Sequence, residues 1–236
     1  MMRSKRRREV EPCLVGRREA ILALGTAGLG VIALAAPPLR RLGLSALDGD
    51  EAWAQACTRA PELTEGPYYI SNSQLRRNIL ERRPGVTLWL SLRVIDAGTC
   101  STIPGAVVDI WHADADGEYS GFNGADNDTF MRGRQGVGNS GVASFRTVYP
   151  GWYPGRTPHV HIKVHVAGAE VHTGQLFMEE SVTDAVYARE PYASRGERDT
   201  RNAADQIFRS GGDATILTIA PRGKGLWGSI TLAVAT

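Results

Sequence analysis

Short segments in which apolar and polar residues alternate recur along the chain, and each is bounded by Gly, Pro or Asp. They are rich in β-branched and aromatic residues, which suit a half-buried pleated surface. Seven such segments with turn signals between them indicate a sandwich or barrel rather than a βαβ fold. We therefore predict an all-β fold, a β-sandwich of short, mostly antiparallel strands with long loops. The predicted strands are residues 86–96, 106–113, 141–149, 159–167, 170–178, 214–219 and 227–235.

Helical patterns are few and short. We expect helices only at residues 73–81, 183–188 and 199–208. Residues 121–139 combine Gly, Asn and Asp with little periodicity, which predicts a long loop. Because such a loop in a compact domain usually has a function, we expect it to overhang a site. It contains Arg132 and Arg134, either of which could meet a substrate carboxylate or face water.

The amino terminus has a different pattern from the rest. A basic start precedes an apolar run at residues 20–36. As a helix this run would span roughly 25 Å, short of the ~30 Å hydrocarbon core of a membrane. The Arg17-Arg18 pair just before it resembles a twin-arginine signal. The interpretation is export by the twin-arginine machinery to the periplasm or the extracellular space, and an uncleaved membrane anchor is the alternative.

Residues 52–54 (AWA) offer a signal-cleavage site, so we divide the chain into a targeting segment, residues 1–54, and a catalytic domain, residues 55–236. The whole chain has a formal net charge of +2, but the second part holds 18 basic and 19 acidic residues. Nothing therefore indicates a nucleic-acid partner. Cys57 and Cys100 remain in this part, either as a disulfide that ties the mature amino terminus to the body or as two buried thiols.

The segment from His159 onward alternates strictly between apolar and polar residues. Its valines and isoleucine share one face, and His159 and His161 share the other. Imidazoles two residues apart on a strand lie roughly 6–7 Å apart, close enough to bind one metal ion. Taken alone, an H-x-H pattern is more often the solvated face of an edge strand, so the neighbouring residues decide between these interpretations.

Those neighbours favour the metal site. Three prolines between residues 150 and 158 stiffen a turn-rich segment that could hold Tyr153 and Arg156 beside the histidines. A turn at residues 116–117 follows a predicted strand and would deliver Tyr119 to the rim of the same site. We interpret His112, next to a tryptophan on a predicted core strand, as structural.

Five segments in this order and spacing resemble the intradiol ring-cleavage dioxygenases, the family of the catechol 1,2-, hydroxyquinol 1,2- and protocatechuate 3,4-dioxygenases. The segments are 64–69 (TEGPYY), 104–112 (PGAVVDIWH), 117–121 (GEYSG), 150–154 (PGWYP) and 156–161 (RTPHVH). The resemblance covers about residues 60–180. Without a long helical amino-terminal dimerisation region, the chain is more similar to the exported, protocatechuate-dioxygenase-like branch. The resemblance implies four metal ligands, Tyr119, Tyr153, His159 and His161. It also implies that Arg156, Gln175 and Tyr153 are catalytic.

The resemblance also implies the chemistry. Two phenolates, whose free pKa is about 10, favour a strongly acidic trivalent ion, so the expected cofactor is iron(III). A small aromatic diol would displace Tyr153 from the metal, and O₂ would then cleave the ring between the two hydroxyl-bearing carbons to a muconate-type dicarboxylate. Arg156 would stabilise negative charge on the ring, and Gln175 would position the substrate.

Two other functions compete with this interpretation. A secreted, non-catalytic β-sandwich binding module would carry the H-x-H incidentally and would be colourless and free of metal. A zinc hydrolase would need a carboxylate beside the two histidines, and the sequence offers no obvious one. The substrate's identity and the oligomeric state are not readable from the sequence, which is compatible with a homo-oligomer.

Overall fold

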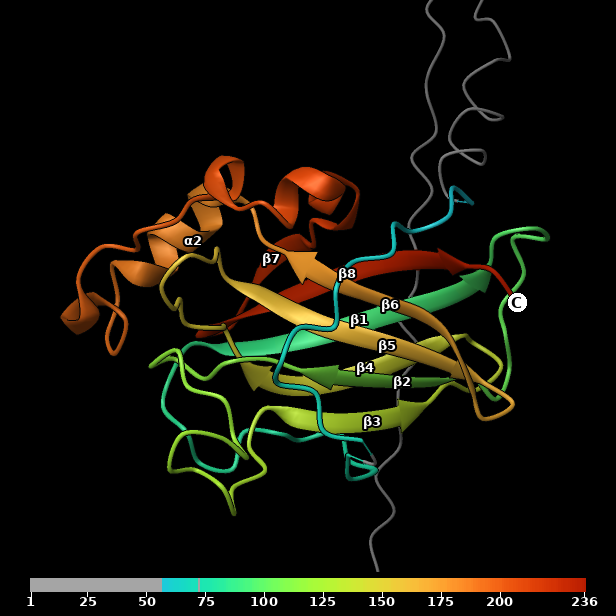
Figure 1. The fold of residues 1–236 in the computed structure, drawn as a ribbon, viewed down its shortest axis with the longest axis horizontal. Coiled ribbons are helices and arrows are strands. Elements are labelled where there is room, and N and C mark those ends of the chain that lie inside the picture. The colour runs from blue at the N-terminus through green and yellow to red at the C-terminus, as the bar shows by residue number, and fades with distance from the viewer. Residues whose placement is uncertain (1–56, 72) are drawn as a thin grey trace, which may run out of the picture. The chain divides into compact units, whose positions relative to one another are not determined.

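The computed structural model describes residues 57–71 and 73–236, so the predicted targeting segment and its cleavage site lie outside the described residues. The described part confirms the predicted β-sandwich: two four-stranded sheets pack face to face (Figure 1). Neighbouring strands are antiparallel except for β1 and β8, which run parallel. Within the described residues, no helix is long and apolar enough to cross a membrane.

In neither sheet does the spatial order of the strands follow their order along the chain. The first sheet has the order β4 (Val142–Val148), β1 (Thr87–Asp96), β8 (Gly225–Val234) and β7 (Thr218–Arg222). The second has the order β3 (Arg132–Gly136), β2 (Val107–Trp111), β5 (His159–Val166) and β6 (Ala169–Phe177). β5 is thus an inner strand, which rules out an edge-strand origin for the H-x-H pattern.

The core lies between the two sheets, because each strand sends alternate residues inward. From β1 these include Leu88, Leu90 and Leu92, and from β5 they include Val160 and Ile162, all fully buried. In β5 the opposite face is buried too. A second layer must therefore cover the outer face of the second sheet.

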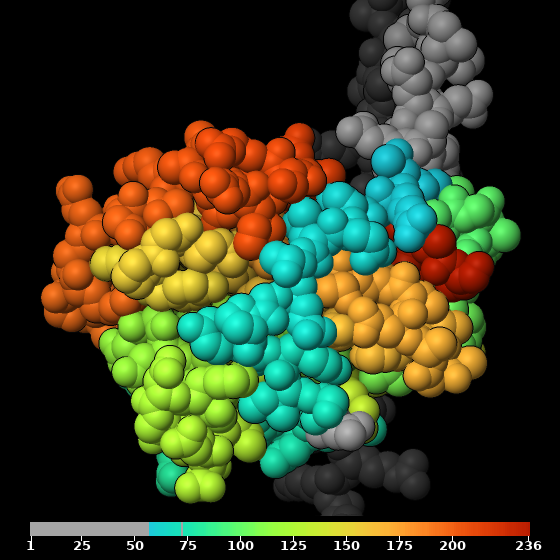
Figure 2. All heavy atoms as spheres, in the orientation of Figure 1, coloured from blue at the N-terminus to red at the C-terminus, as the bar shows by residue number. Residues whose placement is uncertain are grey.

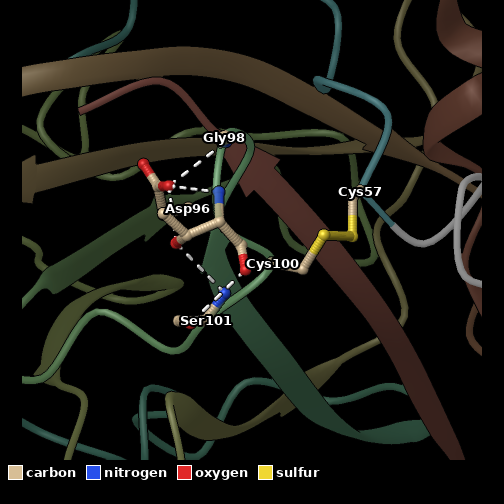
Figure 3. Close-up of a disulfide and its surroundings, with 6 residues drawn as sticks. Cys57, Asp96, Gly98, Cys100 and Ser101 are labelled. Atoms are coloured by element: carbon tan, nitrogen blue, oxygen red, sulfur yellow. Dashed lines mark hydrogen bonds between the residues drawn. A yellow bond between two sulfur atoms is a disulfide. The ribbon is translucent and has the colours of Figure 1, made fainter.

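That layer is residues 57–71 and 73–80, here called the strap. The strap crosses the outer face of the second sheet and appears in cyan and teal in Figures 1 and 2. The Leu63 amide donates to the Thr173 carbonyl of β6, and further along the strap the Arg76 amide donates to the Arg134 carbonyl of β3. At its start Cys57 forms a disulfide with Cys100 (Figure 3). The pairing left open by the sequence is therefore a disulfide.

Two predicted helices are wrong. Residues 73–81 form no helix, because the backbone of residues 74–79 pairs with sheet edges: the Ile79 amide, for example, donates to the Arg146 carbonyl of β4. Such tertiary pairing overrides local helix propensity. Residues 199–208 contain only 3₁₀ turns, η2 (Asn202–Ala204) and the beginning of η3 (Phe208–Ser210).

Other elements begin at different residues from those predicted. Helix α2 (Glu180–Tyr187) confirms the helix predicted at residues 183–188 but begins three residues earlier. The predicted strand at residues 214–219 begins later, at Thr218, after η4 (Gly212–Thr215). Residues 121–139 are not one loop, because β3 lies among them and pairs with β2. The remaining short 3₁₀ turn is η1 (Ala193–Arg195).

Candidate active site

The two histidines of β5 lie on the outer face of the second sheet, under the strap. His159 and His161 are 2% and 1% exposed, so this face is not solvated. Their Nε2 atoms point toward each other at 3.1 Å. Two ligands on adjacent corners of a metal, each about 2.1 Å from it, are about 3 Å apart. The imidazole pair is therefore already spaced to bind one ion.

Different contacts orient the two rings. Nδ1 of His159 donates to the Thr157 carbonyl at 2.7 Å, which leaves the Nε2 lone pair free for a metal. His161 instead stacks on Trp111, with ring centroids 4.8 Å apart. On the strap, Gly66 has φ +70°, and a Cβ there would lie 3.2 Å from His161 Cε1. Glycine at this position lets the strap close over the ring.

Tyr153 and Arg156 are the first and last residues of a tight turn that ends three residues before β5. Pro154 is its second residue, and Gly155, at φ +83°, is its third, the sequence that a type II turn requires. The Arg156 amide donates to the Tyr153 carbonyl at 3.2 Å. The turn places the Tyr153 hydroxyl 3.2 Å from Nε2 of His159. The sequence therefore predicted correctly that this proline-rich segment lies beside the histidines.

Tyr119 arrives from the other side, after β2. The carboxylate of Asp114 accepts hydrogen bonds from the amides of Asp116 and Glu118, both at 3.0 Å, and fixes the turn that precedes it. Gly117 has φ +81°, and a Cβ there would lie 2.2 Å from the Trp152 carbonyl oxygen. Tyr119 is 4% exposed rather than on an open rim. Its hydroxyl makes no hydrogen bond of acceptable geometry within the described residues.

Burial controls the protonation of all four side chains. It lowers the pKa of His159 to about 3, helped by the charge of Arg156, and lowers the pKa of His161 well below its ordinary value. Burial also raises the pKa of Tyr119 and of Tyr153 above the usual 10. The imidazoles are thus neutral ligands, whereas the phenols ionise only beside a strongly acidic cation.

The four donor atoms therefore suit a hard, trivalent cation. The Tyr153 hydroxyl lies 3.2 Å from Nε2 of His159, which lies 3.1 Å from Nε2 of His161, and the Tyr119 ring contacts the rings of Tyr153 and His161. The buried Tyr119 hydroxyl makes no well-aligned hydrogen bond within the described residues. Within the described residues, no group of three or more His, Cys, Asp or Glu side chains is arranged to hold a metal. The carboxylate that a zinc hydrolase would need is thus not found beside this pair.

Arg156 and Gln175 complete the predicted set. The Arg156 guanidinium donates through Nη2 to Oε1 of Gln175 at 2.5 Å, and its Nη1 lies 3.3 Å from Nε2 of His159. Gln175, on β6 beside His161 in register, donates from Nε2 to the Thr64 carbonyl of the strap at 2.8 Å. The structure therefore brings together all six residues named from the sequence.

Asp205 is a residue that the sequence analysis missed. Its fully buried carboxylate accepts from Nε of Arg156 at 2.8 Å and from the Thr157 amide at 2.9 Å. Its other oxygen accepts from the Ile207 and Phe208 amides. Burial opposes its ionisation, but the hydrogen bond and charge of Arg156 hold its pKa below the usual range. Asp205 follows Arg156 by 49 residues, and no local pattern marks it.

A cavity of about 360 Å³ opens onto the two tyrosines. Tyr68 of the strap forms one wall and stacks on Tyr119, with centroids 4.3 Å apart and planes at 17°. The other lining residues are Gly117, Glu118, Tyr119, Phe122, Asn123, Tyr153 and Pro154. Tyr68 belongs to a segment that carried the family resemblance, but we assigned it no role from the sequence. Arg132 is not exposed toward substrate: its guanidinium donates to the Ser120 and Tyr68 carbonyls.

Comparison with known proteins agrees with this site. Residues 64–188 match the family model described as "Dioxygenase". The intradiol ring-cleavage dioxygenase from Tetranychus urticae is 37% identical, with a TM-score of 0.72, over 76% of this chain and 95% of that one. The 3-chlorocatechol 1,2-dioxygenase from Rhodococcus opacus 1CP, at 20% identity and a TM-score of 0.59 over 80% of this chain and 79% of that one, shares the fold.

Curated relatives are more distant. A chlorocatechol 1,2-dioxygenase from Cupriavidus pinatubonensis is 28% identical over 49% of this chain and 53% of its own length. A catechol 1,2-dioxygenase from Pseudomonas sp. (strain EST1001) is 26% identical over 72% of this chain and 65% of its own. The chain thus spans about half the length of the first of these relatives. With the family model matching more than half of its residues, the chain belongs to the intradiol ring-cleaving dioxygenases.

Proposed function

We propose that the protein is an iron(III)-dependent dioxygenase that opens the ring of a small catechol between its two hydroxyl-bearing carbons. The observation that carries this proposal is the donor set of Tyr119, Tyr153, His159 and His161, of which the two tyrosines line a cavity of about 360 Å³. When bound there, iron(III) would draw electron density from a chelating catecholate and so make a ring carbon reactive toward O₂.

The protein's own residues then have separate tasks. Tyr153 is only half-buried and lies on a turn, so its hydroxyl oxygen is the group that can move away and take a proton from the substrate. Arg156, held by Asp205, is a fixed cation beside the ring, where it stabilises developing negative charge. Gln175 links the guanidinium to the strap and fixes the distance between them.

The cavity favours an uncharged catechol over a carboxylated one. Aromatic rings and Glu118 line it, and no Lys or Arg of the described chain is among the lining residues. Arg132, which sequence analysis considered for a carboxylate, already donates to two backbone carbonyls. A carboxylate against the cavity wall would meet no Lys or Arg there, and Arg156 already donates to Asp205 and Gln175, so burying that carboxylate would be costly.

Metal analysis and oxygen uptake test the proposal together. Protein expressed with sufficient iron should contain about one iron per chain, be burgundy from tyrosinate charge transfer, and consume O₂ with catechol faster than with protocatechuate. Zinc, or no stoichiometric metal, would contradict the iron proposal. A colourless protein without activity would instead support the binding module, and faster turnover of protocatechuate would contradict only the substrate preference.

We also propose export of the folded protein. The Cys57–Cys100 disulfide supports it, because disulfides persist in oxidising compartments. Fractionation of cells that express the full chain tests this proposal. Replacing Arg17 and Arg18 by Lys should retain the protein in the cytoplasm, whereas unchanged export would contradict a twin-arginine route.

A further inference from the structure

The outer face of the first sheet lies on the opposite side of the sandwich from the candidate active site. Its outward residues, here called the arginine–tryptophan face, are basic, aromatic or hydroxylated except for Val142 and Ala220, and none carries a carboxylate. Arginine is contributed by three of its four strands. The outward residues are Thr87, Trp89, Ser91, Arg93, Val142, Ser144, Arg146, Thr218, Ala220, Arg222, Trp227, Ser229 and Thr231.

Strand register arranges these side chains in rows. Trp89 of β1 lies between Arg146 of β4 and Trp227 of β8. Two residues further along β1, Ser91 lies between two other serines, of β4 and β8, and the row continues to Thr218 of β7. With strands about 4.8 Å apart, each row is roughly 15 Å long. An aromatic and cationic row thus runs beside a row of hydroxyl groups.

A groove lies over the aromatic row. Its volume is about 420 Å³, and Arg77, Arg146 and Arg222 line it together with both tryptophans. The Arg222 guanidinium is 4.8 Å from the ring centroid of Trp89 and 4.8 Å from that of Trp227. This contact orders a cation on a flat aromatic surface.

The guanidinium groups around this groove have no carboxylate partner among the described residues. Arg77, Arg146 and Arg222 form no ion pair with a carboxylate of the described residues, although twelve ion-pair contacts occur elsewhere in that part of the chain. The hydroxyls of Ser91 and Ser229 likewise donate to no described residue. Three unpaired guanidinium groups around one groove create a local positive field that an anionic ligand would neutralise.

We propose that the arginine–tryptophan face binds an acidic polysaccharide, a chain of sugar rings that carry carboxylates. Guanidinium groups pair with carboxylates through two parallel hydrogen bonds. The apolar face of a sugar ring fits a flat indole surface, and the hydroxyl row can exchange hydrogen bonds with sugar hydroxyls. An extended row of about 15 Å suits consecutive sugars of a polymer better than one small anion.

The same face is less suited to a lipid surface. Its two tryptophans are half-buried beneath Arg222 and do not protrude. The exposed large apolar side chains of the described chain, Ile70 and Leu75, belong to the strap instead. Insertion into a membrane would need apolar side chains that project from the face.

Calorimetric titration of the holoprotein with oligogalacturonate tests the proposal. We expect binding at least 10-fold tighter than to a cello-oligosaccharide of equal length, and at least 10-fold tighter than to the methyl ester of the same oligogalacturonate. The ester removes the charge from the ligand and needs no protein variant. Equal binding of the neutral sugars would overturn the proposal, as would equally tight binding of anionic phospholipid vesicles or of duplex DNA at the same ionic strength.

A charge-matched pair of variants then locates the site. Arg146→Gln with Arg222→Gln should weaken oligogalacturonate binding at least 10-fold and leave oxygen uptake with catechol unchanged. The control, Arg59→Gln with Arg209→Gln, removes the same charge from exposed positions on the strap and in η3. If the control weakens binding as much, the effect is one of net charge, and the site assignment is wrong.

Discussion

The imidazole of His161 lies flat against the indole of Trp111, with ring planes 8° apart. A histidine that binds a metal usually donates its second ring nitrogen to an acceptor, which fixes the ring. Nδ1 of His161 has no hydrogen-bond partner among the described residues. The stacked indole on its face and Gly66 at its edge therefore set the orientation of this imidazole.

Removing the indole should loosen the metal. Trp111→Leu is expected to weaken iron binding about 10–100-fold, the loss typical when a group that orients a metal ligand is removed. Trp111→Phe keeps a ring and should lose less. The measurement is the rate at which a chelator removes iron, read from the visible band. Trp227→Leu, on the opposite face of the sandwich, is the control. Iron release from Trp111→Leu at the wild-type rate would show that stacking does not orient His161.

Asp205 should act on catalysis through Arg156. Arg156→Ala is expected to retain iron and colour but lose roughly 10²-fold or more in turnover, because a preorganised cation is lost. Asp205→Asn keeps the cation but removes the charged acceptor of its Nε–H. We therefore expect a smaller loss of kcat, with iron content unchanged.

Steady-state oxygen uptake, together with the iron content of each variant, distinguishes these effects. Asp213→Asn, which removes an exposed carboxylate of η4, is the control. Asp205→Glu should restore part of the lost kcat if the carboxylate positions Arg156. If Asp205→Asn lowers iron content and kcat in the same proportion, Asp205 instead maintains the metal site as a whole.

Sequence patterns predicted those parts of the site whose residues lie close together along the chain, and missed those that join distant segments. Alternation along β5 predicted that His159 and His161 share one face, and the proline-rich, turn-rich segment before them predicted that Tyr153 lies beside them. Both patterns act within a few residues. The pairing of Arg156 with Asp205 joins segments 49 residues apart, and no periodicity encodes it. β3 was missed for the same reason: its sequence, RGRQG, is polar, and only pairing with β2 makes it a strand.

His112 gives the protein a measurable pH dependence. The side chain is fully buried; Nδ1 donates to the Ala113 carbonyl, and Nε2 accepts from the Thr147 hydroxyl. Burial lowers its pKa from 6.5 to about 4. Between these two pH values the unfolded chain binds a proton that the folded protein does not. The free energy of unfolding should therefore fall as pH falls from 6.5 to 4, by on the order of 3 kcal/mol from this residue.

Denaturant unfolding of the iron-free protein at several pH values measures this loss. His112→Asn removes the titrating group, so its free energy of unfolding should fall less over the same interval. Other buried histidines titrate in both proteins and cancel in the difference. Parallel pH profiles for the two proteins would mean that His112 is protonated in the folded state as easily as in the unfolded chain.

The two tyrosines should have distinct roles, because the structure holds them differently. Tyr119 is 4% exposed and follows a turn fixed by Asp114, so we expect it to stay on the metal throughout turnover. Tyr153 is half-buried on the turn before β5 and is the ligand expected to leave when substrate chelates. Tyr153→Phe should keep its iron but bind catechol more slowly, because the base that takes the substrate's proton is gone.

Tyr119→Phe should damage the resting site more. It is expected to hold iron less tightly and to lose the part of the visible band that persists after substrate binds, since that band would come from the ligand that stays. Visible spectra of each variant, recorded before and after catechol is added without oxygen, separate the two ligands. The roles are reversed if Tyr153→Phe loses its iron while Tyr119→Phe keeps a tyrosinate band in the substrate complex. In that case, burial does not decide which phenolate leaves.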